Sequence, residues 1–169
     1  MTTYLIERRQ RIARPAEEVF AFFSDATNLD LLTPPWLHFQ VRTPSPIVMR
    51  VGTRIEYTIR WYGLPIRWLT EIVEWAPGRR FVDTQLRGPY RLWHHTHRFI
   101  SDGCGTIMED AVRYALPLGP VGRVVHALVV RRDVHRIFDY RAARIDELMK
   151  AAGAELPRTP DGILADDSY

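Results

Sequence analysis

The stretch from Gly88 to Pro117 decides how this chain folds; it reads GPYRLWHHTHRFISDGCGTIMEDAVRYALP. Two segments rich in apolar and β-branched residues flank the turn residues SDGCG, which is typical of a β-hairpin. Side chains alternate between the two faces of a strand, so one face of the first segment carries Trp93, His95, His97 and Phe99. Two imidazoles between two aromatic rings predict an apolar wall with a few placed polar groups, as in a small-molecule pocket.

Length and composition predict one globular domain. The chain has 169 residues, 46% of them hydrophobic, and a domain of this size buries roughly 70% of its unfolded surface without needing a disulfide or a metal. We expect the domain to span residues 1–153 and a C-terminal tail to span residues 154–169. The single cysteine, Cys104, lies between two glycines in the hairpin turn and cannot form an internal disulfide.

Charge and motifs exclude several classes of function. The net charge is +3, but the basic residues are scattered, with no run longer than a pair, so we expect no nucleic-acid binding. The chain contains neither a G-x-G-x-x-G motif nor a P-loop, and no G-x-S-x-G motif. The N-terminus has no apolar signal segment, and the longest apolar stretch, around residues 124–130, is far shorter than the about 20 residues of a membrane span. We therefore expect a cytoplasmic protein.

The order of the predicted elements gives an α+β architecture. Tyr4–Ile12 alternates like a strand, Pro15 begins a helix with two acidic residues in its first turn, and residues 25–35 predict a turn and a second short helix. A run of strands with short turns follows, which indicates an antiparallel sheet. We expect these strands, before the hairpin described above, at residues 36–43, 53–62, 66–75 and 79–87.

A long helix is predicted after Pro120. Apolar residues recur there every three or four positions, which is typical of a helix with one buried face, and the pattern continues to about Gly153. The predicted buried stripe consists of Val121, Val125, Leu128, His135, Phe138, Ala142, Ile145 and Met149. A curved sheet wrapped around this helix would bury the stripe and leave a space between sheet and helix.

These segments resemble the START / Bet v 1-like (SRPBCC) superfamily, in particular its bacterial ligand-binding, polyketide cyclase-like subgroup. The resemblance rests on IARPAEEVF at residues 12–20, on the short helix ending in Thr33-Pro34-Pro35, and on the pattern between Phe81 and Gly119. It covers roughly residues 3–150. It implies a helix-grip fold, in which a curved antiparallel sheet wraps a long C-terminal helix, and a cavity for a hydrophobic ligand. It does not imply a reaction, because members include lipid carriers, hormone receptors and polyketide cyclases.

We expect the chain to bind a small, mainly hydrophobic molecule, as a carrier or sensor does. The alternative is a polyketide cyclase/dehydratase-like enzyme in which a His–Asp pair transfers a proton, with His95, His97 and Asp110 as the candidate catalytic residues. The expected apolar ligand contacts are Trp68, Trp93, Phe99, Tyr114, Leu128 and Phe138. The expected polar contacts are Asp83, Gln85, His95, His97 and Asp110, since carboxylates on an apolar wall are costly unless they are paired.

His95 and His97 could also share a metal ion, with Asp110 or Asp83 as the third protein ligand. The competing interpretation is that both histidines form hydrogen bonds within the pocket wall. The resembled subgroup is not known for metal binding, so we expect neither a metal nor a cofactor. A homodimer through a sheet edge or the helix is left open.

Overall fold

The computed structural model describes residues 1–154, and its elements follow the predicted order of strand, short helices, strands and long helix. In chain order they are β1 (Tyr4–Ile12), α1 (Ala16–Phe23), η1 (Ala26–Asn28), α2 (Leu29–Leu32), η2 (Pro35–Leu37), β2 (Gln40–Val41), β3 (Arg54–Trp61), β4 (Leu64–Ala76), β5 (Arg80–Arg87), β6 (Leu92–Asp102), β7 (Gly105–Ala115), α3 (Gly119–Val125), the π-helical η3 (His126–Val130) and α4 (Arg131–Ala154). The predicted tail lies outside the described residues, except for Ala154 at the end of α4.

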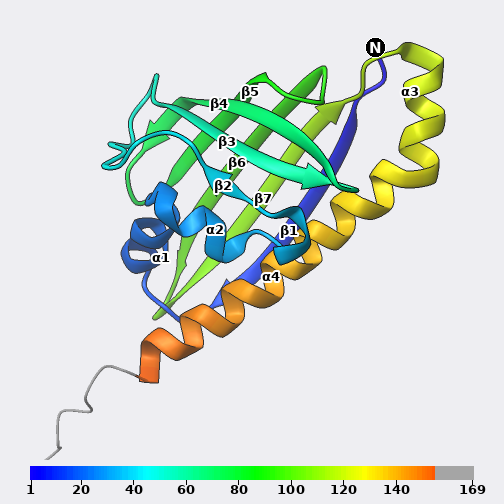
Figure 1. Ribbon diagram of the computed structural model, residues 1–169. Helices are drawn as coiled ribbons and strands as arrows, with labels where there is room; N and C mark the ends of the chain where they lie inside the picture. The colour runs from blue at the N-terminus through cyan, green and yellow to red at the C-terminus, as the bar shows by residue number, and fades with distance from the viewer. Residues whose placement is uncertain (155–169) are drawn as a thin grey trace, which may run out of the picture.

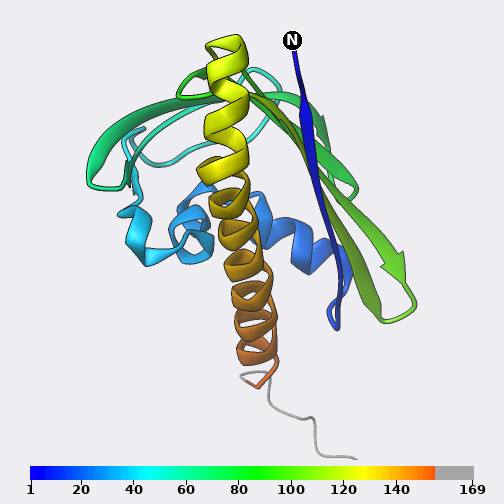
Figure 2. The same ribbon diagram turned by 90° about the vertical axis from the view of Figure 1, so that its right-hand side faces the viewer.

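The strands form a single antiparallel sheet in the order β1-β7-β6-β5-β4-β3-β2. Tight turns join consecutive strands from β3 to β7, and Gly63 and Gly103 adopt positive φ in two of them, a conformation that glycine adopts without strain. β1 pairs with β7 along its whole length, from Tyr4 opposite Tyr114 to Ile12 opposite Thr106. Figures 1 and 2 show the sheet curving around the long helix, with α1 and α2 beside it. The predicted α+β helix-grip fold is confirmed.

The long helix buries a different stripe from the one predicted over its first half. The structure turns Gly122, His126, Val130 and Val134 inward, each four residues from the next. Leu128 is 74% exposed, so its predicted inward position is wrong. The reason is the π-helical segment η3, whose wider turn changes the phase that a uniform 3.6-residue repeat assumes. From Phe138 onward the prediction holds, since Phe138, Ile145 and Met149 are all buried.

The predicted strand at residues 36–43 is also wrong in extent. Only Gln40–Val41 pair with β3, while Pro35–Leu37 form a turn of 3₁₀ helix. Two consecutive prolines explain the difference, because Pro34 and Pro35 fix φ near the helical value and donate no backbone hydrogen bond to a neighbouring strand. The loop that follows contains a cis peptide bond between Ser45 and Pro46.

Two apolar clusters form the core between sheet and helix. The first lies under α1 and includes Phe20, Phe23, Phe81 and Phe99, whose rings contact one another at centroid distances of 5.4–6.1 Å. The second lies toward α3. Its buried members are Ile6, Val112, Tyr114, Val130, Val134 and Phe138. The two clusters meet at His95 and His97, where Phe81 of the first and Phe138 of the second contact the imidazole rings.

A buried histidine fixes the beginning of the long helix against the sheet. The ring of His126 stacks on Tyr4 of β1 at a centroid distance of 3.4 Å, and its Nε2 lies 2.9 Å from the hydroxyl of Tyr114 on β7. Burial lowers the pKa of His126, and the nearby positive charge of Arg131 and the side chain of His135 lower it further. The neutral imidazole is therefore the form that this packing favours.

Candidate functional site

A cavity of about 360 Å³, partly open to solvent, lies between the concave face of the sheet and the long helix. This volume is within the range of small-molecule sites. Most of its wall is apolar, with contributions from α1, α2, strands β3 to β6 and the long helix. Six of the residues that we predicted as ligand contacts line it. They are Trp68, Asp83, Trp93, His95, His97 and Phe138.

The register of three strands collects the polar residues of the wall. The alternation of β6 turns His95 and His97 toward the helix, as predicted, and both are buried. On one side β5 places Asp83 opposite His95, and on the other β7 places Asp110 opposite His97. Cross-strand neighbours on one face have side chains about 5 Å apart, so the two carboxylates lie on either side of the two imidazoles.

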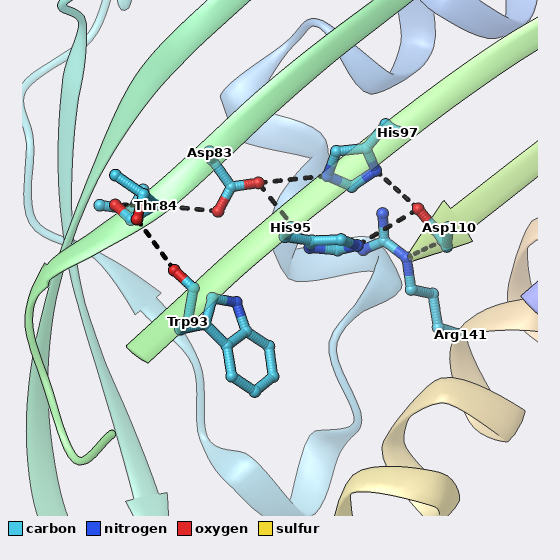
Figure 3. A network of polar contacts seen from close by, with 8 residues as sticks. Asp83, Thr84, Trp93, His95, His97, Asp110 and Arg141 are labelled. Atoms are coloured by element: carbon cyan, nitrogen blue, oxygen red, sulfur yellow. Dashed lines mark hydrogen bonds and ion pairs between the residues drawn. The ribbon is translucent and has the colours of Figure 1, made fainter. Parts of the chain in front are cut away.

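The four side chains make a closed set of contacts, which Figure 3 shows. Oδ2 of Asp83 lies 3.2 Å from Nε2 of His97 and 3.7 Å from Nδ1 of His95. Oδ1 of Asp110 lies 2.7 Å from Nδ1 of His97 and 3.3 Å from Nε2 of His95. Each carboxylate thus contacts one nitrogen of each ring. We call Asp83, His95, His97 and Asp110 the His–Asp cluster.

Two further residues anchor the carboxylates. From α4, Nε of Arg141 donates to Oδ2 of Asp110 at 3.2 Å, and its side chain is only 12% exposed (Figure 3). From β4, the hydroxyl of Thr70 donates to Oδ1 of Asp83 at 3.1 Å. The arginine matters most, because a buried carboxylate without a cation costs several kcal/mol.

Burial and charge set the protonation of the cluster. Burial alone raises the pKa of Asp110, but the positive charges of Arg141 and His97 outweigh it and hold the pKa well below its usual range. The pKa of Asp83 is lowered in the same way, since its contacts with His97 and His95 outweigh burial. Both carboxylates are therefore ionised at neutral pH.

The pKa values of the two imidazoles shift in opposite directions. For His97, burial lowers the pKa, but attraction and hydrogen bonding to Asp110 and Asp83 outweigh burial, so the pKa is raised. For His95, burial and the charge of His97 dominate, so the pKa is lowered. With His97 protonated, two negative and two positive charges balance, since Arg141 supplies the other positive charge.

The aromatic part of the wall lies directly beside the cluster. Phe81 stacks on His97 at a centroid distance of 4.2 Å, and Phe138 meets the ring of His95 edge-on at 5.6 Å. Beyond His95, Trp93 contacts Trp68 at 5.2 Å, edge to face. A molecule in the cavity would therefore meet aromatic surface almost everywhere and ionisable groups at one place.

Five predicted site residues lie outside the cavity wall. Asp110 is held behind the imidazoles, and Phe99 packs against Phe20 and Phe23 under α1. Gln85 binds the backbone of Tyr90, donating to its oxygen at 2.6 Å, and so stabilises the turn between β5 and β6. The remaining two are Tyr114, which contacts His126, and the exposed Leu128.

Sequence reasoning missed Arg141 and Thr70. Arg141 follows Phe138 by three positions on the buried face of α4, so the signal was an arginine on an otherwise apolar stripe. Thr70 lies on the same inner face of β4 as Trp68 and Ile72, but threonine is common in strands and gave no distinct signal. Tyr57 was not missed, since its alternation on β3 predicted a place on the cavity wall; it lines the cavity and stacks on Trp68 at 5.7 Å.

Fold and site together define a helix-grip protein with an internal ligand cavity. The family model "Polyketide cyclase / dehydrase and lipid transport" matches residues 4–150, and the chain belongs to this family. No curated protein matches the chain. Within the described residues, no helix is long and apolar enough to cross a membrane.

Solved structures share the fold at low sequence identity. The protein TTHA0849 from Thermus thermophilus has 22% identity and a TM-score of 0.65, over 88% of this chain and 99% of that one. The Zhui aromatase/cyclase from a Streptomyces species has 15% identity and a TM-score of 0.66, over 90% and 99%. A norcoclaurine synthase from Thalictrum has 15% identity and a TM-score of 0.67, over 90% and 97%. At these identities the comparisons establish the fold and leave the activity open.

Proposed function

We propose that this protein binds a small, mainly hydrophobic molecule in the cavity between sheet and helix, as a cytoplasmic carrier or sensor. The observation that carries the proposal is the cavity of about 360 Å³ with an aromatic wall and one buried ionisable cluster. A ligand with an apolar body and one polar end matches this distribution. Trp68, Trp93 and Phe138 would contact the body, while His95, His97 and Asp83 would orient the polar end.

Two features support recognition of a polar end. His95, His97 and Asp83 are all on the cavity wall, and hydrogen bonds to charged groups contribute about 1.5–3 kcal/mol each. The cluster is also held rigidly from three strands and α4, which lowers the entropy lost when a ligand binds.

A binding experiment with a matched pair of variants tests the proposal. Ile66 lines the cavity, whereas Leu64, two residues earlier on β4, is 65% exposed and does not. We expect 1-anilinonaphthalene-8-sulfonate to bind saturably with a 1:1 stoichiometry. Ile66→Trp should weaken binding at least tenfold by filling the cavity, whereas Leu64→Trp should leave it unchanged. Equal effects of the two substitutions, or no saturable binding by the wild type, would refute the proposal. Native mass spectrometry of protein from its own host would then identify the natural ligand.

A second candidate is a cyclase/dehydratase-like enzyme. It is favoured by one observation, the 3.3 Å contact between Nε2 of His95, on the cavity wall, and Oδ1 of Asp110, because a carboxylate that orients a neutral imidazole is an arrangement that general bases use. Incubation with a linear polyketide-like thioester would test it. An aromatic product that forms with the wild type and not with His95→Gln supports the enzyme. Substrate recovered unchanged from a saturated complex supports the carrier.

A further inference from the structure

We propose that Asp83, His95 and His97 form a binding site for a divalent transition metal, with Zn²⁺ as the expected ion. This proposal departs from the expectation, drawn from the family resemblance, that no metal is bound. It goes beyond ligand binding, because it concerns the metal alone and requires no organic molecule. It uses one wall of the same cavity, so the experiment below measures the two properties separately.

Two of the three distances between the proposed ligand atoms are close to those of a zinc site. Zn–N and Zn–O bonds of about 2.0–2.1 Å in a tetrahedron separate neighbouring ligand atoms by about 3.3–3.4 Å. Oδ2 of Asp83 lies 3.2 Å from Nε2 of His97 and 3.7 Å from Nδ1 of His95. One ligand atom from each residue falls within 4.8 Å of the other two. The two distances from Asp83 are thus within a few tenths of an ångström of the tetrahedral value, and a metal ion would draw the two imidazole nitrogens to the same separation.

The opposite nitrogens of the same two rings face a second carboxylate. Oδ1 of Asp110 lies 2.7 Å from Nδ1 of His97 and 3.3 Å from Nε2 of His95. In metal sites, ligating histidines usually donate their remaining N–H to such a carboxylate, which fixes the ring and increases its basicity. Arg141 holds this carboxylate from α4. One residue thus orients both proposed histidine ligands.

The charges of the cluster leave a place for a second cation. Asp83 and Asp110 carry two negative charges, and within the described residues Arg141 pairs with Asp110. The charge of Asp83 then remains for a second cation to balance, either a proton on His97 or a metal ion.

The donor set selects the class of metal. Two imidazoles and one carboxylate suit Zn²⁺ and other first-row transition metals, whereas Mg²⁺ and Ca²⁺ prefer oxygen ligands. All three proposed ligands line the cavity, so a further coordination position would face it. A site with three protein ligands and one open position is the arrangement of zinc sites that bind substrate rather than only stabilise a fold.

Titration with the metal alone tests the proposal. Untagged protein, treated with a chelator and dialysed, is titrated with ZnCl₂ by calorimetry, and Co²⁺ is added to a second sample to record its visible absorption bands. We expect one Zn²⁺ per chain and a tetrahedral Co²⁺ spectrum. His95→Gln, His97→Gln and Asp83→Asn should each weaken binding at least 100-fold. His94→Gln is the matched control, because His94 lies between the two proposed ligands on the opposite face of β6, and it should change nothing.

Asp110→Asn separates a positioning role from a ligand role. We expect this variant to retain one Zn²⁺ with an affinity lower by about 10–100-fold, as for other residues that orient a metal ligand. Thermal unfolding of every variant identifies any that do not fold. If the ligand variants do not fold, the Co²⁺ spectrum and the Zn²⁺ stoichiometry of the wild type decide whether the metal site exists. Absence of stoichiometric binding by folded wild type overturns the proposal, as does unchanged affinity in both histidine variants. Binding of 1-anilinonaphthalene-8-sulfonate by the same metal-free samples shows whether the proposed ligand cavity stands independently.

Discussion

Replacing Arg141 with methionine should destabilise the protein far more than replacing a neighbouring arginine on the same helix. Arg141 is the arginine that contacts Asp110, and the two side chains are 12% and 6% exposed. Methionine keeps the length and the apolar contacts of the side chain but removes the charge. The substitution therefore leaves a buried carboxylate whose remaining partners are the imidazoles of His97 and His95.

The size of the effect follows from burial. Removing one partner of a buried ion pair costs about 3–5 kcal/mol, and the contacts of Asp110 with the imidazoles place this case at about 3 kcal/mol. For a domain of this size, that corresponds to a decrease in Tm of roughly 6–12 °C. The control is Arg144→Met, whose partner Glu147 lies 2.9 Å away, with side chains 36% and 66% exposed. An exposed pair of this kind contributes about 0–1 kcal/mol.

Urea unfolding followed by tryptophan fluorescence at pH 7 measures these free energies. The double variant Arg141→Met/Asp110→Asn completes a cycle, and we expect it to cost less than the sum of the two single variants by about 2 kcal/mol, because both remove the same interaction. A cost below about 1 kcal/mol for Arg141→Met, similar to that for Arg144→Met, would refute the reasoning, as those are values for exposed ion pairs. Strictly additive single variants would also refute it.

Two further predictions concern the beginning of the long helix. Gly122→Ala should lower stability by about 1–3 kcal/mol, since a Cβ there would collide with the backbone oxygen of Pro117; thermal unfolding at neutral pH measures this, and an unchanged Tm contradicts it. The pKa of His126 is lowered by burial, by Arg131 and by His135, so the folded state binds fewer protons than the unfolded state. The contribution of His126 to the free energy of unfolding is therefore fully present above about pH 6.5, the usual pKa of histidine, and decreases as the pH falls below it. His126→Gln should make the free energy of unfolding less dependent on pH between 5 and 7, and an unchanged slope contradicts this.

The alternation of side chains between the two faces of β6 made the centre of the site predictable from the sequence. Strand periodicity is local, so the inward direction of His95 and His97 followed from their positions relative to Trp93 and Phe99. Asp83 was predictable for the same reason. What alternation does not give is register, and register decides that Asp83 lies opposite His95 and that Asp110 lies opposite His97.

The helix was harder to predict because its phase depends on tertiary packing. A uniform repeat placed Leu128 inward, whereas the π-helical turn of η3 brings His126 to Tyr114 and turns Leu128 to solvent. Since a π-turn is stabilised by contacts with the sheet, local propensity contains no reliable sign of it. Arg141 was missed for a related reason, because its role depends on Asp110 of β7, 31 residues earlier in the chain.

The His–Asp cluster is a poor way to stabilise this fold, and that supports a role in binding. It lies where the two apolar clusters meet, with Phe81 on one side and Phe138 on the other, so apolar side chains could have joined them directly. Replacing buried ionic groups by packed apolar residues is often neutral or stabilising by about 1–4 kcal/mol. Oppositely shifted pKa values of neighbouring groups, here His95 and His97, are also more frequent at functional sites than elsewhere. If these positions served only the core, apolar side chains would give equal or greater stability. A cavity that recognises the polar end of a ligand, or a metal ion, requires ionisable side chains on its wall.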